Sequence, residues 1–255
     1  MTRRGDAPLG APVWIELSTS DMPASQAFYT GLFGWEVEPS NPDFGGYTNF
    51  LLDGGRIAGS MHKPDEQPGP DSWFVYLASS DCAATVASAE TAGAEVLVPA
   101  MPVLDLGTMA FLMAPDGSVV GVWQPGSHRG FSHIDEPGAP AWFELHTLDY
   151  DNSLAFYSSV FGWTTDVMMD TPEFRYARLV DGEALLAGIL DATPHMAPEF
   201  PSHWEIYFET TDMEVSSAKV LELGGQVLMP PHESPFGRLG LFVDCTGAMF
   251  KLVER

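Results

Sequence analysis

The sequence has few basic side chains. Its 255 residues include 11 Lys and Arg against 35 Asp and Glu, which gives a formal net charge of −24. A surface this acidic repels nucleic-acid phosphates and anionic lipid. We therefore expect no nucleic-acid partner and no membrane partner, although the acidity itself identifies no substrate.

Long apolar runs and cysteines are also scarce. No stretch approaches the ~18 apolar residues of a membrane-spanning helix, and the opening MTRRGDAPLGAP lacks the apolar core of a secretory signal. These absences predict a cytoplasmic protein. Cys82 and Cys245 lie in unlike contexts without CxxC spacing, which favours two reduced thiols over a disulfide or a zinc site.

What the sequence does contain is a repeat. PVWIELSTSDMPASQAFYTGLFGW, residues 12–35, matches PAWFELHTLDYDNSLAFYSSVFGW, residues 140–163, at 13 of 24 positions. The similarity continues from Trp73 against Trp204, with an offset that differs by only a few residues. Similarity at one long period indicates that a structural unit has been duplicated, so we predict two homologous halves.

Each half is itself built from two similar units. In the first unit, residues 13–19 alternate like a strand, residues 21–33 have helical spacing behind an aspartate cap, and residues 53–55 form a hairpin turn. The pattern restarts at residue 72 with a strand, a helix and further strands. The chain is therefore predicted to hold four such units.

A Gly/Pro-rich segment without periodicity separates the halves. We predict an N-terminal tail over residues 1–11, a first domain over 12–125, a linker over 126–139 and a second domain over 140–255. Because the halves are homologous, a monomer can supply internally the pairing that single-domain proteins obtain by dimerising. The sequence leaves a homodimer open.

The repeated helix motif D-x-x-x-S-x-x-F-Y-x-x-x-F-G-W and the D/A-P-x-G hairpins resemble the vicinal oxygen chelate superfamily. This superfamily includes glyoxalase I, extradiol dioxygenases and bleomycin-resistance proteins. The tandem form, with W-x-E-L-x-T-x-D in both halves, looks most like actinobacterial two-domain glyoxalase-like proteins, a group that includes a mycobacterial antigen. The resemblance implies an α+β fold of four βαβββ modules that form two tandem domains with cupped mixed sheets.

The resemblance also says where a metal would be bound. Metal-using members carry ligands on the first strand of each module and a glutamate on the last strand, all aimed into the cup. The matching positions here are Trp14, Phe74, Trp142 and Glu205 on first strands, and Gly121 and Lys251 on last strands. Of these residues only Glu205 can bind a divalent cation. We therefore predict that the usual metal centre is absent, that no cofactor is bound, and that Lys251 forms an ion pair with Glu205 instead.

A shifted metal site is the alternative. Side chains two apart in a strand share a face, so Glu144 points the same way as His146, and His203 the same way as Glu205. If the two strands are neighbours, these four residues could bind Zn, Ni, Mn or Fe, although they could equally be polar side chains satisfied by hydrogen bonds. An extradiol dioxygenase needs two histidines and a carboxylate facing iron, and we do not expect that activity here.

Glu16 and Glu144 are candidate acid/base residues. By alternation each shares a face with a tryptophan, Trp14 or Trp142, and His146 joins Glu144. A carboxyl group buried among aromatic rings has a raised pKa, which suits general acid or base catalysis. We therefore predict catalytic roles for Glu144, His146 and Glu16, and structural hydrogen bonding of both glutamates is the alternative.

Several aromatic side chains and one arginine are candidate ligand contacts. The rings could stack on a planar ligand and the guanidinium could pair with an anionic group, although core packing and a loop contact explain them as well. The candidates are Trp14, Trp142, Trp204, Tyr207 and Arg238. His128, in the linker, either closes over a cup or lies in an exposed loop.

These residues together predict a metal-independent protein that binds a planar or carbonyl-bearing metabolite in an aromatic cup. It would either sequester that small molecule, as resistance proteins do, or move protons on it. A metal-dependent glyoxalase-like lyase or isomerase using the shifted ligands is the second hypothesis. A protein that keeps the fold only for interactions with other proteins is the third.

Overall fold

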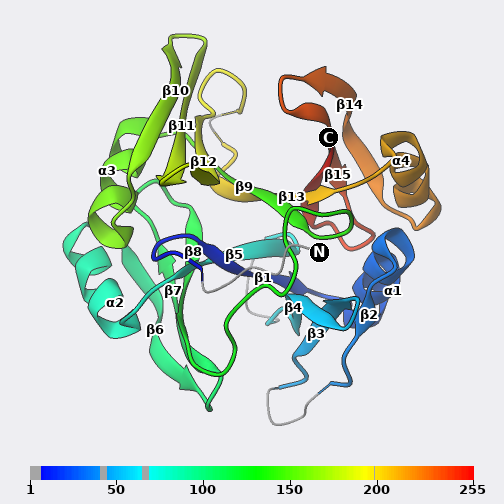
Figure 1. Cartoon of the computed structure of the whole chain (residues 1–255), viewed down its shortest axis with the longest axis horizontal. Helices are drawn as coiled ribbons and strands as arrows, with labels where there is room; N and C mark the ends of the chain where they lie inside the picture. The colour runs from blue at the N-terminus through cyan, green and yellow to red at the C-terminus, as the bar shows by residue number, and fades with distance from the viewer. Residues whose placement is uncertain (1–6, 41–44, 65–68, 198) are drawn as a thin grey trace.

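The computed structural model describes residues 7–40, 45–64, 69–197 and 199–255. The two halves of the chain each form one eight-stranded mixed sheet, and each sheet carries two helices (Figure 1). Within these described ranges, no helix is long and apolar enough to cross a membrane. Cys82 and Cys245 are both free thiols.

The first sheet has the strand order β2-β3-β4-β1-β5-β8-β7-β6. β1 lies between β4, to which it is parallel, and β5, to which it is antiparallel, so the two modules of this half join through their first strands. Along the chain the elements are β1 (Pro12–Thr19), α1 (Met22–Phe33), β2 (Glu36–Val37), β3 (Thr48–Leu52), β4 (Gly55–His62), β5 (Ser72–Ala78), α2 (Cys82–Thr91), β6 (Glu95–Val103), β7 (Gly107–Met113) and β8 (Val119–Pro125).

The second sheet repeats this order as β10-β11-β12-β9-β13-β16-β15-β14. Its first strands, β9 and β13, are again antiparallel neighbours at the centre. The elements are β9 (Pro140–Thr147), α3 (Tyr150–Phe161), β10 (Thr165–Thr171), β11 (Phe174–Asp181), β12 (Ala184–Asp191), β13 (His203–Glu209), α4 (Met213–Glu222), β14 (Gln226–Ser234), β15 (Gly237–Val243) and β16 (Met249–Glu254). The predicted α+β fold of four βαβββ modules in tandem is confirmed.

The repeated helix begins and ends where its sequence requires. The Asp21 carboxylate accepts a hydrogen bond from the Ala24 backbone N–H at 3.0 Å, which caps the first turn of α1. Gly34 ends the helix with φ 73°, a left-handed conformation that glycine adopts without strain. Gly162 ends α3 in the same way, with φ 69°.

The tryptophan that follows each of these glycines joins the two halves. Trp35 Nε1 donates to the Gly138 carbonyl at 2.7 Å, just before the second domain begins. Trp163 Nε1 donates to the Gly10 carbonyl at 2.8 Å, just before the first domain begins. The F-G-W part of the repeated motif therefore binds each helix end to the segment that leads into the other half, which explains why both copies carry it.

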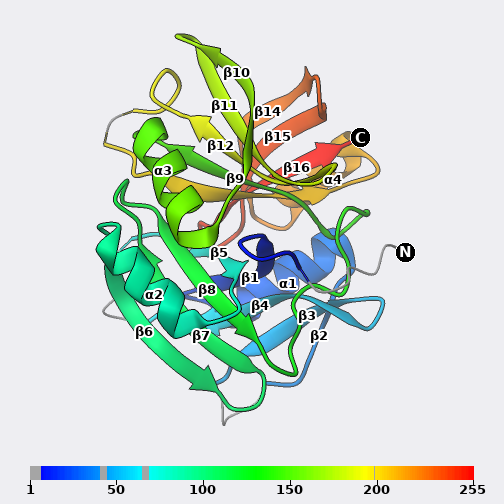
Figure 2. The same cartoon turned by 60° about the vertical axis from the view of Figure 1, so that its left-hand side comes forward.

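The helix-covered faces of the two sheets pack against each other. Tyr29 Oη on α1 donates to Asp244 Oδ2 at 3.0 Å, and Ser153 Oγ on α3 donates to Asp116 Oδ2 at 3.1 Å. Figure 2 shows the helices gathered between the sheets, while the strands of the two sheets flare away from each other. The helix-free faces thus point to opposite sides, and we call them the first cup and the second cup.

Candidate functional site

The second cup gathers ionisable side chains from neighbouring strands. β9 and β13 pair in a register that puts Glu144 opposite Glu205 and His146 opposite His203. On the other side of β13, Lys251 of β16 lies opposite Tyr207. The two strands are therefore neighbours, and Glu144, His146, His203 and Glu205 lie side by side on them.

Glu144 is buried and accepts hydrogen bonds on both carboxylate oxygens. Tyr176 Oη donates to Oε1 at 2.8 Å, and Tyr207 Oη donates to Oε2 at 2.7 Å. His146 Nε2 lies 2.6 Å from Oε2. We call Glu144, His146, Tyr176, Tyr207 and Lys251 the polar cluster.

Lys251 brings a positive charge into the polar cluster. Its Nζ lies 3.5 Å from Glu144 Oε2 and 3.2 Å from His146 Nε2, and it donates to Tyr207 Oη at 2.8 Å. Burial raises the pKa of Glu144, but Lys251, His146 and Tyr207 outweigh burial and hold this pKa well below its usual range. Glu144 is therefore a carboxylate held by its neighbours, and it carries no proton to donate.

Glu205 lies beside the polar cluster with only one of its oxygens bonded. Its Oε1 is 3.0 Å from His203 Nε2, and His203 Nδ1 is 2.9 Å from the Pro201 carbonyl. Burial raises the pKa of Glu205, while the hydrogen bond from His203 and the charge of Lys251 lower it, and the net direction is downward. Among the described residues, none supplies a hydrogen bond to the buried Oε2 of Glu205.

In the first cup the corresponding residue is Glu16, and its hydrogen-bond partners are uncharged tyrosines. Tyr76 Oη donates to Glu16 Oε1 at 3.1 Å, and Trp14 Nε1 donates to Tyr47 Oη at 3.0 Å. Burial raises the pKa of Glu16 from 4.5 to about 7, because hydrogen bonds from Tyr76 and Tyr47 offset only part of the effect of burying its charge. Where the second cup has His146, His203, Glu205 and Lys251, the first cup has Ser18, Ser72, Phe74 and Gly121.

The linker covers the tryptophan of the first cup. The ring centre of His128 lies 4.4 Å from Trp14, and that of Phe131 lies 5.7 Å from Trp14. Burial lowers the pKa of His128 to about 4, so the ring packs there without a charge. Trp14 is 4% exposed, whereas Trp142 is only half-buried. The linker therefore closes the first cup at a point where the second cup can be reached from solvent.

The sequence matches one family model in both halves. The model of the Glyoxalase/Bleomycin resistance protein/Dioxygenase superfamily matches residues 11–122 and 139–252. The chain belongs to this superfamily. The predicted resemblance is therefore confirmed, and the two matched segments carry the two sheets described above.

Two groups of full-length relatives are similar to this superfamily member. "Putative glyoxylase CFP32" of Mycobacterium tuberculosis is 35% identical over 260 residues, which cover 100% of this chain and 98% of the relative. "Anthracycline biosynthesis protein DnrV" of Streptomyces peucetius is 34% identical over 264 residues, which cover 96% of this chain and 93% of the relative. Both relatives therefore share the whole tandem arrangement.

Solved structures support the same fold at lower sequence identity. The Mn(II)-bound glyoxalase of Novosphingobium aromaticivorans superposes with a TM-score of 0.67 at 16% identity, covering 96% of this chain and 82% of that one. The 2,3-dioxygenase LapB of Pseudomonas sp. KL28 superposes with a TM-score of 0.66 at 13% identity, covering 98% and 94%. At these identities the likeness shows the fold alone.

The residues of the second cup, as arranged, do not fit a divalent cation. The ammonium of Lys251 faces two of the four ligands predicted for a shifted site, His146 and Glu144. The other two, His203 and Glu205, are bonded to each other. In the part of the chain that the structure describes, no group of three or more His, Cys, Asp or Glu is arranged to hold a metal ion. The chemistry proposed below therefore uses the protein's own groups.

Two of the predicted ligand contacts lie outside the cups. Trp204 stands between His203 and Glu205 on β13, so it faces the helix side, where its Nε1 donates to Tyr157 Oη at 3.2 Å. Arg238 lies on the same side of the second sheet, within 2.7 Å of Glu214 on α4. The predictions for Trp204 and Arg238 were wrong: the tryptophan packs in the core, and the arginine forms surface ion pairs.

Two predictions about charge also need correction. A raised pKa was expected for both glutamates and is found only for Glu16, because Lys251 and His146 reverse the effect of burial at Glu144. Lys251 was expected to pair with Glu205, but its ion pair is with Glu144. The other predicted residues, Trp14, Trp142, Tyr207 and His146, do line the cups.

The sequence reasoning missed the tyrosines that complete each site. Tyr176 Oη and Tyr47 Oη reach toward the glutamates across Gly188 and Gly59, where an added Cβ would lie 2.0 Å and 1.8 Å from the respective oxygen. Tyr47 directly precedes β3 and Tyr176 lies in β11, at matching places in the repeat, Y-T-N-F and Y-A-R-L. Comparing residues that are identical in both halves outside the best-matching segment would have found them.

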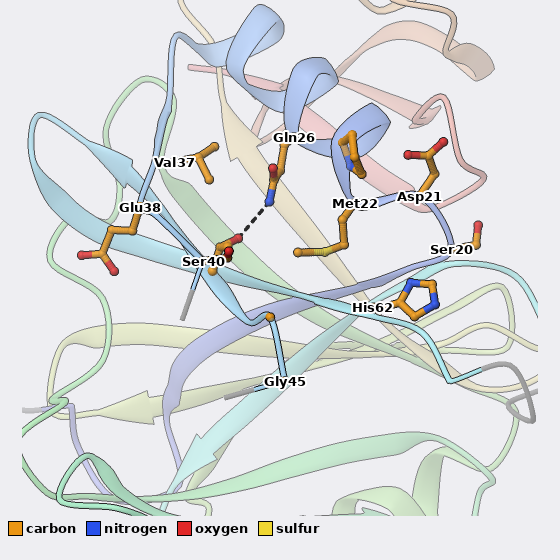
Figure 3. A pocket seen from close by; sticks show the side chains of 12 residues that line it. Ser20, Asp21, Met22, Gln26, Val37, Glu38, Ser40, Gly45 and His62 are labelled. Carbon is orange, nitrogen blue, oxygen red and sulfur yellow. Dashed lines mark hydrogen bonds between the residues drawn. The ribbon is translucent and has the colours of Figure 1, made fainter. Parts of the chain in front are cut away.

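Two cavities lie away from both glutamates. One, of about 520 Å³, is at the N-terminal end of α1, where Met22 and Gln26 of the helix and His62 of β4 line it (Figure 3). Gln26 is tied to Thr48 by a hydrogen bond of 2.9 Å. The other, of about 550 Å³, lies between the β3–β4 turn and residues 127–133 of the linker. We place the candidate site in the second cup, because that is where charged and titratable groups converge.

Proposed function

We propose that the second cup binds a planar, carbonyl-bearing small molecule and that His146 moves a proton on it. The observation that carries this proposal is the presence of His146 and Lys251 in the polar cluster, because the matching positions of the first cup are Ser18 and Gly121. Charged groups packed in an apolar site are typical of acid/base chemistry.

The geometry gives each member of the polar cluster a role. Glu144, ionised and bonded to His146 Nε2 at 2.6 Å, fixes the orientation of the imidazole. Within the described residues no hydrogen bond reaches His146 Nδ1, which leaves that nitrogen as the acceptor for a substrate proton. His146 is half-buried, so a ligand in the cup can reach it.

The proton taken by His146 would come from a carbon next to a carbonyl group. Its removal leaves an enolate, whose negative charge the ammonium of Lys251 and the new imidazolium stabilise. Return of the proton to another atom of the same ligand completes an isomerisation without any added reactant. The half-buried indole of Trp142, fixed by its 3.0 Å bond to Tyr176 Oη, supplies an aromatic wall for a planar ligand.

The relatives are compatible with small-molecule chemistry. Their names, a putative glyoxylase and an anthracycline biosynthesis protein, both refer to reactions of small organic compounds. Binding without turnover is the second candidate, and the carboxylate of Glu144 favours it, because both of its oxygens are already held by Tyr176, Tyr207 and His146.

Quenching of tryptophan fluorescence by a panel of planar quinones and aromatic ketones tests binding. We expect a saturable ligand whose affinity falls at least about tenfold in Trp142→Phe, the loss of one good aromatic contact, and is unchanged in Trp14→Phe. A panel with no saturable ligand, or a loss in Trp14→Phe alone, would sink the proposal.

Hydrogen exchange into the ligand tests turnover. In D₂O the wild type should exchange the ligand hydrogen next to the carbonyl, seen by NMR, and His146→Asn should bind the ligand but lose at least about a hundredfold in exchange rate. Saturable binding with no exchange in the wild type would leave the binding-only function as the correct one.

A further inference from the structure

Two buried polar atoms on the inner face of the second cup have no partner among the described residues. One is Oε2 of Glu205, whose residue is 4% exposed, and the other is Nε of Arg178 on β11. The Arg178 side chain is a quarter exposed, and its Nη2 forms an ion pair with Asp166. This ion pair does not involve Nε. A third such atom, Tyr150 Oη, belongs to α3 on the other face.

These two atoms offer complementary chemistry. An ionised carboxylate oxygen accepts a hydrogen bond, and a guanidinium N–H donates one. A buried donor or acceptor without a hydrogen bond destabilises the folded protein. A ligand that forms the missing hydrogen bond at either atom therefore gains binding free energy there. The ligand must then offer a donor at one point and an acceptor at another.

The sheet register fixes how these two points are related. Glu205 of β13 lies opposite Glu144 of β9, Glu144 lies opposite Gly188 of β12, and Gly188 lies opposite Arg178 of β11. The four residues form one row across four strands, with the two unpaired atoms at its ends. Three strand spacings of ~4.8 Å separate the Cα atoms of the end residues by about 14 Å, and both side chains reach inward from there. A ligand that meets both ends is therefore elongated.

One of the two middle residues of this row, Gly188, has no side chain. The Tyr176 hydroxyl lies over Gly188, 2.0 Å from where a Cβ would be, and donates to Glu144. The Tyr176 ring is stacked with Phe174, with centres 5.9 Å apart. The row therefore has polar ends and an aromatic floor, which matches a flat ligand better than a compact one.

We propose that the ligand of the second cup is an elongated, planar hydroxy-carbonyl compound. Its phenolic or enolic hydroxyl donates to Glu205 Oε2, and a carbonyl oxygen farther along the same molecule accepts from Arg178 Nε. This assignment rests on the function proposed above, since it names the ligand class of the same cup. Because Oε2 is out of contact with solvent, the ligand reaches it by displacing His203 and the exposed Phe200, whose ring packs 5.3 Å from His203 at the rim.

A matched pair of probes tests the hydroxyl contact. We would titrate the protein with 2-hydroxyanthraquinone and with 2-methoxyanthraquinone, which has the same rings and carbonyl groups but no O–H, at mildly acidic pH, where the phenol keeps its proton. In the wild type the hydroxy compound should bind about ten- to a hundredfold more tightly, as expected for a hydrogen bond to a charged group.

Three variants locate the contacts. Glu205→Gln should reduce the preference for the hydroxy probe to about threefold or less, because a neutral amide oxygen is a weaker acceptor. Arg178→Met should lower the affinity for both probes by the same factor and leave the preference for the hydroxy probe unchanged. Glu214→Gln, an exposed change on α4 at the helix side of the second sheet, is the control and should change neither affinity nor preference. Thermal unfolding checks that each variant is folded.

The outcomes separate the two proposals. If both probes bind the wild type equally and Trp142→Phe weakens both, the second cup is the binding site but the hydroxyl contact is overturned. A preference that survives in Glu205→Gln overturns it as well. If neither probe binds the wild type, the assignment of this ligand class fails outright, and the fluorescence panel above then decides whether the cup binds any small molecule.

Discussion

Glu16 and Glu144 occupy the same place in two copies of one domain, yet their pKa values are shifted in opposite directions. Burial and a pair of tyrosines surround both side chains. Burial raises the pKa of Glu16 to about 7, whereas Lys251 and His146 hold the pKa of Glu144 below its usual range. The difference shows that a buried glutamate in this fold takes its protonation state from the strands beside it, and from one lysine above all.

The two cups also differ in access. In the first, His128 and Phe131 of the linker cover Trp14, and in the second Trp142 and His146 stay half-buried. The two copies thus differ: one is a closed cup whose glutamate has a raised pKa, and the other is an accessible cup with a charged cluster. The first cup is the internal reference against which each feature of the second can be tested.

Replacing Lys251 with Met should have the largest effect, because it removes the charge that distinguishes the second cup. The change leaves the Glu144 carboxylate buried without its ammonium partner, and loss of one partner of a buried ion pair destabilises by about 3–5 kcal/mol. Denaturant unfolding at neutral pH measures the difference.

The matched control for this change is Lys219→Met, which breaks a surface pair with Glu222 and should leave stability nearly unchanged. Adding Glu144→Gln to Lys251→Met should recover most of the loss, because the unpaired charge is then gone. A loss below about 1 kcal/mol for the single variant would mean that the tyrosines and His146 hold Glu144 without the lysine.

The pH dependence of stability should have opposite signs for the two glutamates. The folded-state pKa of Glu16, about 7, lies above its unfolded value of 4.5, so its contribution is complete below 4.5 and is lost as the pH rises to about 7. The loss amounts to roughly 3 kcal/mol. Glu144 has a lowered folded pKa, so its contribution is present above 4.5 and is lost as the pH falls below that value.

Free energies of unfolding of wild type, Glu16→Gln and Glu144→Gln, measured across acidic and neutral pH, check these signs. The stability of Glu16→Gln relative to the wild type should increase as the pH rises from 4.5 to about 7. The relative stability of Glu144→Gln should increase only as the pH falls below 4.5. Curves that run parallel for both variants would contradict the difference between the cups.

Much of this arrangement could be predicted from strand alternation. The repeat gave four modules, and a period of two put Glu144 with His146 and His203 with Glu205 on inner faces. The same rule, applied to Trp204, would have excluded it from the cup, because it stands between His203 and Glu205. Alternation therefore held wherever it was applied.

What could not be predicted depends on contacts across strands that are distant in sequence. Lys251 meets Glu144 because β16 pairs with β13 in one particular register, which hydrophobic patterning alone does not set. The pKa of Glu144 follows from that contact. The covering of Trp14 by His128 depends on the path of a Gly/Pro-rich linker, which has no period from which a path could be derived.

Adding a methyl group at Gly59 or Gly188 should have a smaller effect that is similar in both cups. Each Cβ would lie within 2.0 Å of the hydroxyl of Tyr47 or Tyr176, so the ring must move and its hydrogen bonds weaken. Gly59→Ala and Gly188→Ala should each destabilise by about 1–3 kcal/mol in denaturant unfolding. A loss in only one of them would show that the tyrosine matters in one cup and is replaceable in the other.

The smallest expected effect is that of Arg238→Ala on ligand binding. Arg238 lies on the helix side of the second sheet, opposite the cup. Its guanidinium forms surface ion pairs there with Glu214, Glu233 and Glu254. The affinity for the best quinone or ketone ligand should be unchanged within error, whereas Trp142→Phe weakens it. A tenfold loss in Arg238→Ala would place ligand on the helix side, and the assignment of function to the second cup would then be wrong.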